Sequence, residues 1–152
     1  MDFETIIRKR TATRKFSSNK PEEDKIKSVL EAFRLAPTAK NFQPQRVIVA
    51  KSDEALAKID KVSHCRYNAP VVFIVCSDKE VAFSNGNYST YEMDACIATT
   101  QMMLEAVNVG LDTIWIEMFD KEALKKEFSL PSNLEPICLL PVGYKASDCP
   151  VN

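Results

Sequence analysis

The sequence predicts one domain, spanning residues 1–152, in which a central β-sheet is covered by helices on both faces. Three observations support this. The chain is long enough for a single core and shows no internal repeat or linker-like change in composition. Helical and strand patterns alternate after an opening pair of helices. Val71–Cys76 is an unbroken apolar run, which is typical of a strand that is buried on both faces.

Two helices are expected before the first strand, the first of them over residues 2–9. The second is expected to have Asn19 as its N-cap, with Pro21 in the first turn and Glu22 completing a capping box. It must end before Pro37, because a proline disfavours helical geometry in the residue that precedes it. The apolar faces consist of Phe3, Ile6 and Ile7 in the first helix and Ile26, Val29, Leu30 and Phe33 in the second.

The middle of the chain is predicted to form two strands separated by a short helix. Arg46–Lys51 has the β-branched composition of a strand, and Ser52 is the expected cap of a helix that continues through Ile59. The buried strand Val71–Cys76 follows, and residues 79–89 are expected to form a loop.

A long apolar helix is expected after this loop. Ser89 and Glu92 have capping-box spacing, and Gly110 is a natural terminator. There is no charge from Ala95 to Leu104, so the helix, about 30 Å long at 1.5 Å per residue, belongs in a core or an interface. A second copy of the chain is a natural cover for such a surface, so we expect a homodimer.

The last part of the chain is predicted to add two strands and one helix. The strands are expected over Thr113–Glu117 and Ile137–Tyr144. The helix between them should be capped by Asp120 and anchored by Leu124 and Phe128.

Composition excludes several classes of protein. The net charge of −1 gives no general attraction for nucleic acid or an acidic membrane. No secretion signal or membrane span is recognisable, so a cytoplasmic protein is expected. The five cysteines include no C-x-x-C pair, which argues against a disulfide scaffold or a zinc site, and we expect no metal. The three glycines form no phosphate-binding loop.

Two polar segments nevertheless suggest a nucleotide-like ligand. Arg10 and Arg14 carry guanidinium groups suited to phosphate, although such a basic cluster, taken alone, is more often a solvated surface. Thr38, Asn41 and Gln43 lie in a loop stiffened by prolines and offer groups that match a heteroaromatic ring. That loop, taken alone, is only a connection between a helix and a strand.

Five motifs, in order along nearly the whole chain, give it a resemblance to the FMN-dependent nitroreductase family. They are Arg10-x-x-x-Arg14-Lys-Phe16, Ala36-Pro-Thr-Ala-Lys-Asn41-Phe-Gln43-Pro44, Asp94-Ala95 to Leu104-x-Ala106, Gly110-Leu-Asp-Thr-Ile-Trp-Ile-Glu117 and Pro141-Val-Gly-Tyr144. The resemblance implies an α+β fold, an α/β/α sandwich with a mixed, largely antiparallel central sheet. It also implies an intertwined homodimer with one FMN at each end of the interface.

The resemblance assigns the cofactor contacts to three segments. Arg10 and Arg14 would bind the flavin phosphate and ribityl chain, and the loop from Pro37 would reach the ring from the partner subunit. Residues 116–118 would pass beside the ring, with a backbone N–H near flavin N5. The residues implied are Arg10, Thr11, Ala12, Arg14, Pro37, Thr38, Ala39, Asn41, Gln43, Ile116, Glu117 and Met118.

The implied activity is hydride transfer from NADH or NADPH to flavin N5, followed by reduction of a nitroaromatic, a quinone or a similar small acceptor. No side chain need act as a nucleophile. His64 is a candidate for a place near the pyrimidine edge of the flavin, although a single histidine is more often a surface or capping residue. The loop Phe83–Tyr88 is expected to influence the choice of acceptor.

Two other interpretations stay open. The first is a non-catalytic dimeric module of the same fold, which binds flavin or has lost it. It is suggested by Ala12 where a serine is common, by Met118 where a small residue is usual, and by the absence of a basic stretch after Asn152. The second is a regulatory domain that uses Arg10 and Arg14 alone to hold an acidic ligand.

Overall fold

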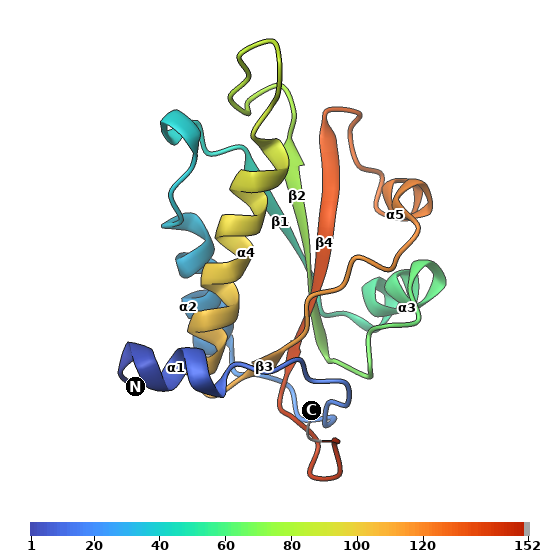
Figure 1. The fold of residues 1–152 in the computed structure, drawn as a ribbon. Helices are drawn as coiled ribbons and strands as arrows, with labels where there is room; N and C mark the ends of the chain where they lie inside the picture. Colours follow the sequence, from blue (N-terminus) through green and yellow to red (C-terminus); the bar gives the residue numbers. More distant parts are fainter. Residues whose placement is uncertain (151–152) are drawn as a thin grey trace.

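The computed structural model describes residues 1–150 and contains a four-stranded antiparallel sheet between two layers of helices (Figure 1). The strands lie in the order β1-β2-β4-β3. In chain order the elements are α1 (Phe3–Lys9), α2 (Glu23–Arg34), the 3-10 turn η1 (Ala39–Asn41), β1 (Gln45–Ala50), α3 (Asp53–Val62), β2 (Val71–Asp78), α4 (Tyr91–Asn108), β3 (Asp112–Thr113), α5 (Lys121–Glu127) and β4 (Leu134–Gly143). The predicted α+β sandwich is therefore confirmed.

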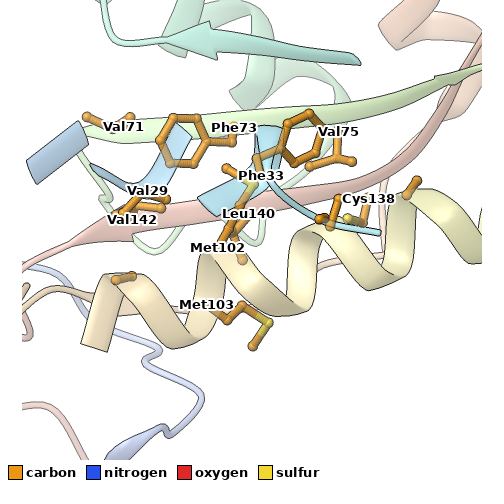
Figure 2. Close-up of a cluster of buried hydrophobic side chains, with 14 of the residues drawn as sticks. Val29, Phe33, Val71, Phe73, Val75, Met102, Met103, Cys138, Leu140 and Val142 are labelled. Carbon is orange, nitrogen blue, oxygen red and sulfur yellow. The ribbon is translucent and has the colours of Figure 1, made fainter. Parts of the chain in front are cut away.

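Each face of the sheet carries its own hydrophobic core, because successive side chains of a strand point to opposite faces. Val71, Phe73 and Val75 of β2 pack with α2 and α4, and Figure 2 shows them beside Phe33 and Met102. The other face is covered by α3 and α5. Its core includes Phe16, Ile59, Val72, Ile74, Leu124 and Leu139. Burial of β2 on both faces confirms the interpretation of the apolar run.

Local capping accounts for three of the helix starts. The side chains of Asp2, Ser52 and Asp120 each accept a hydrogen bond from the backbone N–H three residues later. The caps Ser52 and Asp120 were predicted, and they begin α3 and α5 as expected, whereas Asp2 was expected only as the first residue of its helix. Helix α3 continues to Val62, three residues beyond the predicted end.

The predicted starts of α2 and α4 are wrong in detail. Helix α2 begins at Glu23, so Asn19 is not its cap and Pro21 precedes the first turn. The carboxylate of Glu22 is instead engaged by the Tyr144 hydroxyl. Helix α4 begins at Tyr91, and the buried Ser89 Oγ has no hydrogen-bond partner among residues 1–150. At α2 a contact with a distant part of the chain replaces the local capping box, and at α4 the N-cap is Thr90, one residue after the predicted cap.

The strand predicted over Thr113–Glu117 is mostly wrong, since β3 ends at Thr113. The chain still runs beside β4: the Ile114 N–H donates to Pro141 O at 3.3 Å. Pro141 has no N–H to return that bond, so the regular ladder is interrupted there. Pairing resumes at Ile116, which exchanges two hydrogen bonds of 2.9 Å with Leu139.

Two segments singled out in the sequence, the one around α1 and the one around η1, lie at opposite ends of α4. The N-terminal ammonium, just before α1, donates to Asn108 Oδ1 at 3.2 Å, so α1 lies at the C-terminal end of α4. The turn η1 lies at the other end of α4 (Figure 1). None of the helices within residues 1–150 is long and apolar enough to cross a membrane.

Candidate functional site

A cavity of about 270 Å³ opens between the segment that follows α1 and the segment that follows β3. It has a cationic rim and a largely apolar floor. Its lining consists of Arg10, Ala12, Arg14, Cys65, Tyr67, Met103, Ile114, Trp115, Ile116, Glu117 and Met118. Six of the predicted site residues therefore meet here: Arg10, Ala12, Arg14, Ile116, Glu117 and Met118.

The two arginines of the rim are held by the backbone on either side of them. Arg10 is the C-cap of α1, and its N–H donates to Ile6 O at 3.0 Å. The chain then runs beside β3, where the Thr13 N–H donates to Thr113 O at 3.0 Å. This short contact carries Arg14 across the end of β3 to the cavity.

The charges around the rim are unequally neutralised. Arg8 is paired with Glu4, and Lys15 is paired with Asp148. Among the carboxylates of residues 1–150, none forms an ion pair with Arg10 or Arg14. Two guanidinium groups without carboxylate partners, facing one cavity, favour an anionic ligand at that end.

The opposite wall offers backbone donors. Ile114 and Ile116 are buried and tie the wall to β4. The Ile116 N–H is used by Leu139, whereas the N–H groups of Glu117 and Met118 have no acceptor within the described part of the chain. The Glu117 carboxylate accepts a hydrogen bond of 3.1 Å from Trp115 Nε1.

Met118 lines the cavity and is 66% exposed. Its carbonyl oxygen is fixed by a hydrogen bond of 2.8 Å from Ser63 Oγ, which also accepts from the Cys65 N–H at 3.2 Å. His64, between these two residues, is exposed and does not line the cavity.

Two lining residues, Cys65 and Tyr67, were not predicted as cofactor contacts. Cys65 is buried, and Tyr67 is half-buried beside Arg14. Burial raises the pKa of the Tyr67 phenol, an effect that Cys65 reinforces and the positive charge of Arg14 opposes. The phenol is therefore protonated at neutral pH. The sequence marks Tyr67 only by its place shortly before Ala69-Pro70, which does not specify its orientation.

Thr11 lies apart from the other residues of its segment. It lines a separate cavity of about 370 Å³ with Lys9, Asp112 and Lys145. Since neighbouring residues of an extended chain point in opposite directions, Thr11 faces away while Arg10 and Ala12 face the first cavity. The expected contact from Thr11 stays a prediction.

The second predicted segment, Pro37–Gln43, forms a tight loop around η1. The backbone φ angle is positive at Lys40, Asn41 and Gln43, with values of 51°, 55° and 52°. The Thr38 hydroxyl accepts a hydrogen bond of 3.0 Å from the Gln43 N–H, which closes the loop. Pro37, Asn41 and Gln43 are exposed, so the side-chain amides of Asn41 and Gln43 can be reached by a ligand.

A buried carboxylate anchors this loop to α4. Asp94 is only 2% exposed, and its Oδ1 accepts a hydrogen bond of 2.9 Å from the Ala39 N–H. Its Oδ2 accepts one of 2.8 Å from Thr90 Oγ1. Sequence reasoning did not assign Asp94 a role, although it is an acidic residue directly before a long uncharged stretch.

The two predicted halves of the site do not meet within one chain. The loop is attached at Asp94, whereas the cavity reaches α4 at Met103, nine residues further on. At 1.5 Å per residue these points lie about 14 Å apart along the helix. No residue of Pro37–Gln43 lines the cavity.

Comparisons with known proteins agree on one family. The nitroreductase family model matches residues 7–68 and 66–144. A putative NADH dehydrogenase/NAD(P)H nitroreductase of Methanothermobacter thermautotrophicus is 29% identical over 155 residues, which cover 97% of this chain and 80% of the relative.

Solved structures of the same family share the fold. The crystal structure of a nitroreductase family protein from Clostridium difficile 630 matches with a TM-score of 0.94 and 36% identity, over 99% of this chain and 88% of that one. An FMN-dependent nitroreductase from Clostridium difficile R20291 matches with a TM-score of 0.81 and 25% identity, over 94% of this chain and 87% of that one.

Proposed function

This chain belongs to the nitroreductase family, and from that premise we propose that it is a single-domain, cytoplasmic FMN-dependent oxidoreductase that uses NADH or NADPH. The family predicted from the sequence motifs is confirmed. The observation that carries the proposal is the cavity itself. It brings together two guanidinium groups and a wall with backbone N–H groups, and within residues 1–150 the former have no carboxylate partner and the latter have no acceptor.

The cationic end of the cavity suits the FMN phosphate. Arg10 and Arg14 would donate charge-assisted hydrogen bonds to its oxygens, which are stronger than bonds between neutral groups. Ala12, between them, lines the cavity without a polar side chain. Binding of the phosphate would therefore depend on the two arginines.

The other end suits a planar ring system. Met103, Ile114 and Ile116 supply an apolar floor. Because the Ile116 N–H is already used, the Glu117 and Met118 N–H groups are the ones available to the ring edge. When bound, FMN would accept hydride from NAD(P)H and reduce a nitroaromatic, a quinone or a similar small acceptor. The contribution of the chain is to orient the ring and stabilise its developing negative charge.

The loop Pro37–Gln43 is proposed to serve the cavity of a partner subunit. Several apolar side chains on α1 and α4, and in the residues directly after α2 and η1, stay exposed in one protomer. They are Phe3, Ile7, Leu35, Phe42, Met93 and Ile97. If two copies of α4 pack antiparallel about a two-fold axis, the loop end of one lies beside the cavity end of the other. Such a homodimer would complete both sites.

The proposal is tested first by the cofactor. Purified protein should be yellow with about one FMN per chain, or should gain that colour and a higher Tm when FMN is added. Sedimentation should show a species of twice 17.1 kDa. The proposal would be contradicted by a colourless protein whose Tm does not change when FMN is added.

A second candidate is a flavin-binding module without catalysis. Met118, which lines the cavity and is exposed, favours it, since a methionine there can restrict access to a bound ring. Anaerobic mixing of the FMN-loaded protein with NADH and NADPH separates the two candidates. Bleaching of the flavin absorbance supports the enzyme, whereas an unchanged spectrum supports the module.

A further inference from the structure

A tight turn beside the cavity holds a tyrosine in an unfavourable backbone conformation. The Ala69 N–H donates to Arg66 O at 3.0 Å, and the two residues between them, Tyr67 and Asn68, have φ angles of 53° and 64°. This is the pattern of a type I′ turn, which usually carries glycine, asparagine or aspartate at both central positions. A bulky residue there is strained, and strain of this kind tends to persist at functional positions.

The surrounding structure maintains this strain. Asp60 binds the Arg66 guanidinium through two hydrogen bonds of 2.7 and 2.6 Å, and Arg66 Nη1 donates to Ala69 O at 2.9 Å. The Phe16 N–H donates to Tyr67 O at 3.1 Å. The turn is therefore tied both to α3 and to the segment that begins with Arg14.

Tyr67 lines the same cavity as Arg14. A guanidinium group only donates hydrogen bonds, so in any contact between the two, Arg14 donates and the phenol oxygen accepts. The positive charge of Arg14 lowers the pKa of the phenol, which burial raises more strongly. Arg14 is exposed and has no carboxylate partner within residues 1–150, so a phenol that lines the same cavity is a group that can fix its direction.

We propose that Tyr67 is a positioning residue: its hydroxyl holds the Arg14 guanidinium toward the cavity, where the arginine binds the phosphate of the ligand. The inference rests on the proposed FMN site and deepens it. It assigns the strained turn a purpose, since Tyr67 lines the cavity in this left-handed conformation. It also predicts that Tyr67 affects binding of the phosphate and not binding of the flavin ring.

The test compares FMN with riboflavin, which has the same ring but no phosphate. Tyr67→Phe should weaken FMN binding about tenfold, the usual order for a hydrogen bond to a charged group, and leave riboflavin binding unchanged. The double variant with Arg14→Ala should bind FMN no more weakly than Arg14→Ala alone, because Tyr67 acts through Arg14. Equal losses for both ligands, or effects of the two variants that multiply, would overturn the proposal.

A control and a flavin-free measurement complete the design. Tyr91→Phe removes a phenol that lies outside the cavity and donates to Glu92, and it should leave FMN binding unchanged. In the apoprotein, Arg14→Ala should raise the pH at which one tyrosine ionises, observed by tyrosinate absorbance, and Tyr67→Phe should remove that transition. If wild-type protein binds neither ligand, the proposed function fails, but this titration still decides whether the Tyr67 hydroxyl contacts Arg14. A transition that Arg14→Ala leaves unmoved contradicts it.

Discussion

The buried carboxylate of Asp94 accepts the backbone N–H of Ala39 at 2.9 Å and so fixes the loop Pro37–Gln43 to the first turn of α4. Three residues of this loop have positive φ angles, a conformation that the loop would not keep without such an anchor. In the proposed dimer the loop serves the cavity of the partner subunit. Asp94 would therefore stabilise the fold of one chain and shape the site of the other.

Replacing Asp94 with alanine should cost both stability and cofactor affinity. The change leaves the Ala39 N–H and the Thr90 hydroxyl without their buried acceptor, at a cost of about 2 kcal/mol or more in the free energy of unfolding. Urea denaturation measures the loss. Asp53→Ala, at an exposed site in α3, should change stability by only about 0.5 kcal/mol. Equal effects of the two substitutions would argue against an anchoring role.

Arg10→Ala should weaken FMN binding about tenfold or more, because a charge-assisted hydrogen bond to the phosphate is lost. Flavin fluorescence quenching gives the dissociation constant. Arg10→Lys should recover only part of the affinity, since an ammonium group cannot bind phosphate through two parallel donors. Arg8→Ala is the matched control: Arg8 is two residues away and already paired with Glu4. Comparable losses at Arg8 and Arg10 would indicate a general charge effect.

Gly143→Ala should destabilise the protein by about 1–3 kcal/mol through overpacking. A Cβ at this position would lie 2.8 Å from Pro70 Cδ and 3.2 Å from Phe16 Cδ1. Both neighbours belong to buried segments next to the turn that carries Tyr67. Gly110→Ala offers a comparison, since it meets no atom within 4 Å but has a φ of +79°. Its cost should come from backbone strain alone, at about 1 kcal/mol. A Gly143→Ala protein with wild-type stability would refute the close packing.

Alkaline pH should destabilise the folded chain partly through Cys138. Burial raises the pKa of this thiol from 9.0 to about 12. The unfolded chain therefore releases the proton at a lower pH than the folded chain. The stabilisation is complete below pH 9.0 and is lost as the pH rises toward 12.

Within that pH range, ionisation of this thiol in the unfolded chain should lower the free energy of unfolding by about 1.4 kcal/mol per pH unit. Denaturation at several pH values, with Cys138→Ala as the reference, measures it as the difference between two slopes. The same burial predicts that alkylating reagents leave Cys138 unmodified until the chain unfolds. Parallel stability curves for the two proteins would contradict the expectation.

The sequence by itself determined the features that depend on near neighbours. Asp2, Ser52 and Asp120 cap helices through the N–H group three residues later, so these caps depend only on residues that are close in sequence. The apolar run of β2 also predicts its structure, because a strand that is buried on both faces needs apolar residues on both faces. The family was recognisable as well, since five short motifs keep their order along the chain.

Tertiary structure decided the features that depend on distant partners. Tyr144 engages Glu22, so α2 starts later than its apparent capping box. Pro141 cannot donate to the strand beside it, so β3 is shorter than its β-branched sequence suggests. The cavity is the clearest case. Tyr67 reaches it through a strained turn held by Asp60, and no periodicity or local propensity indicates that contact.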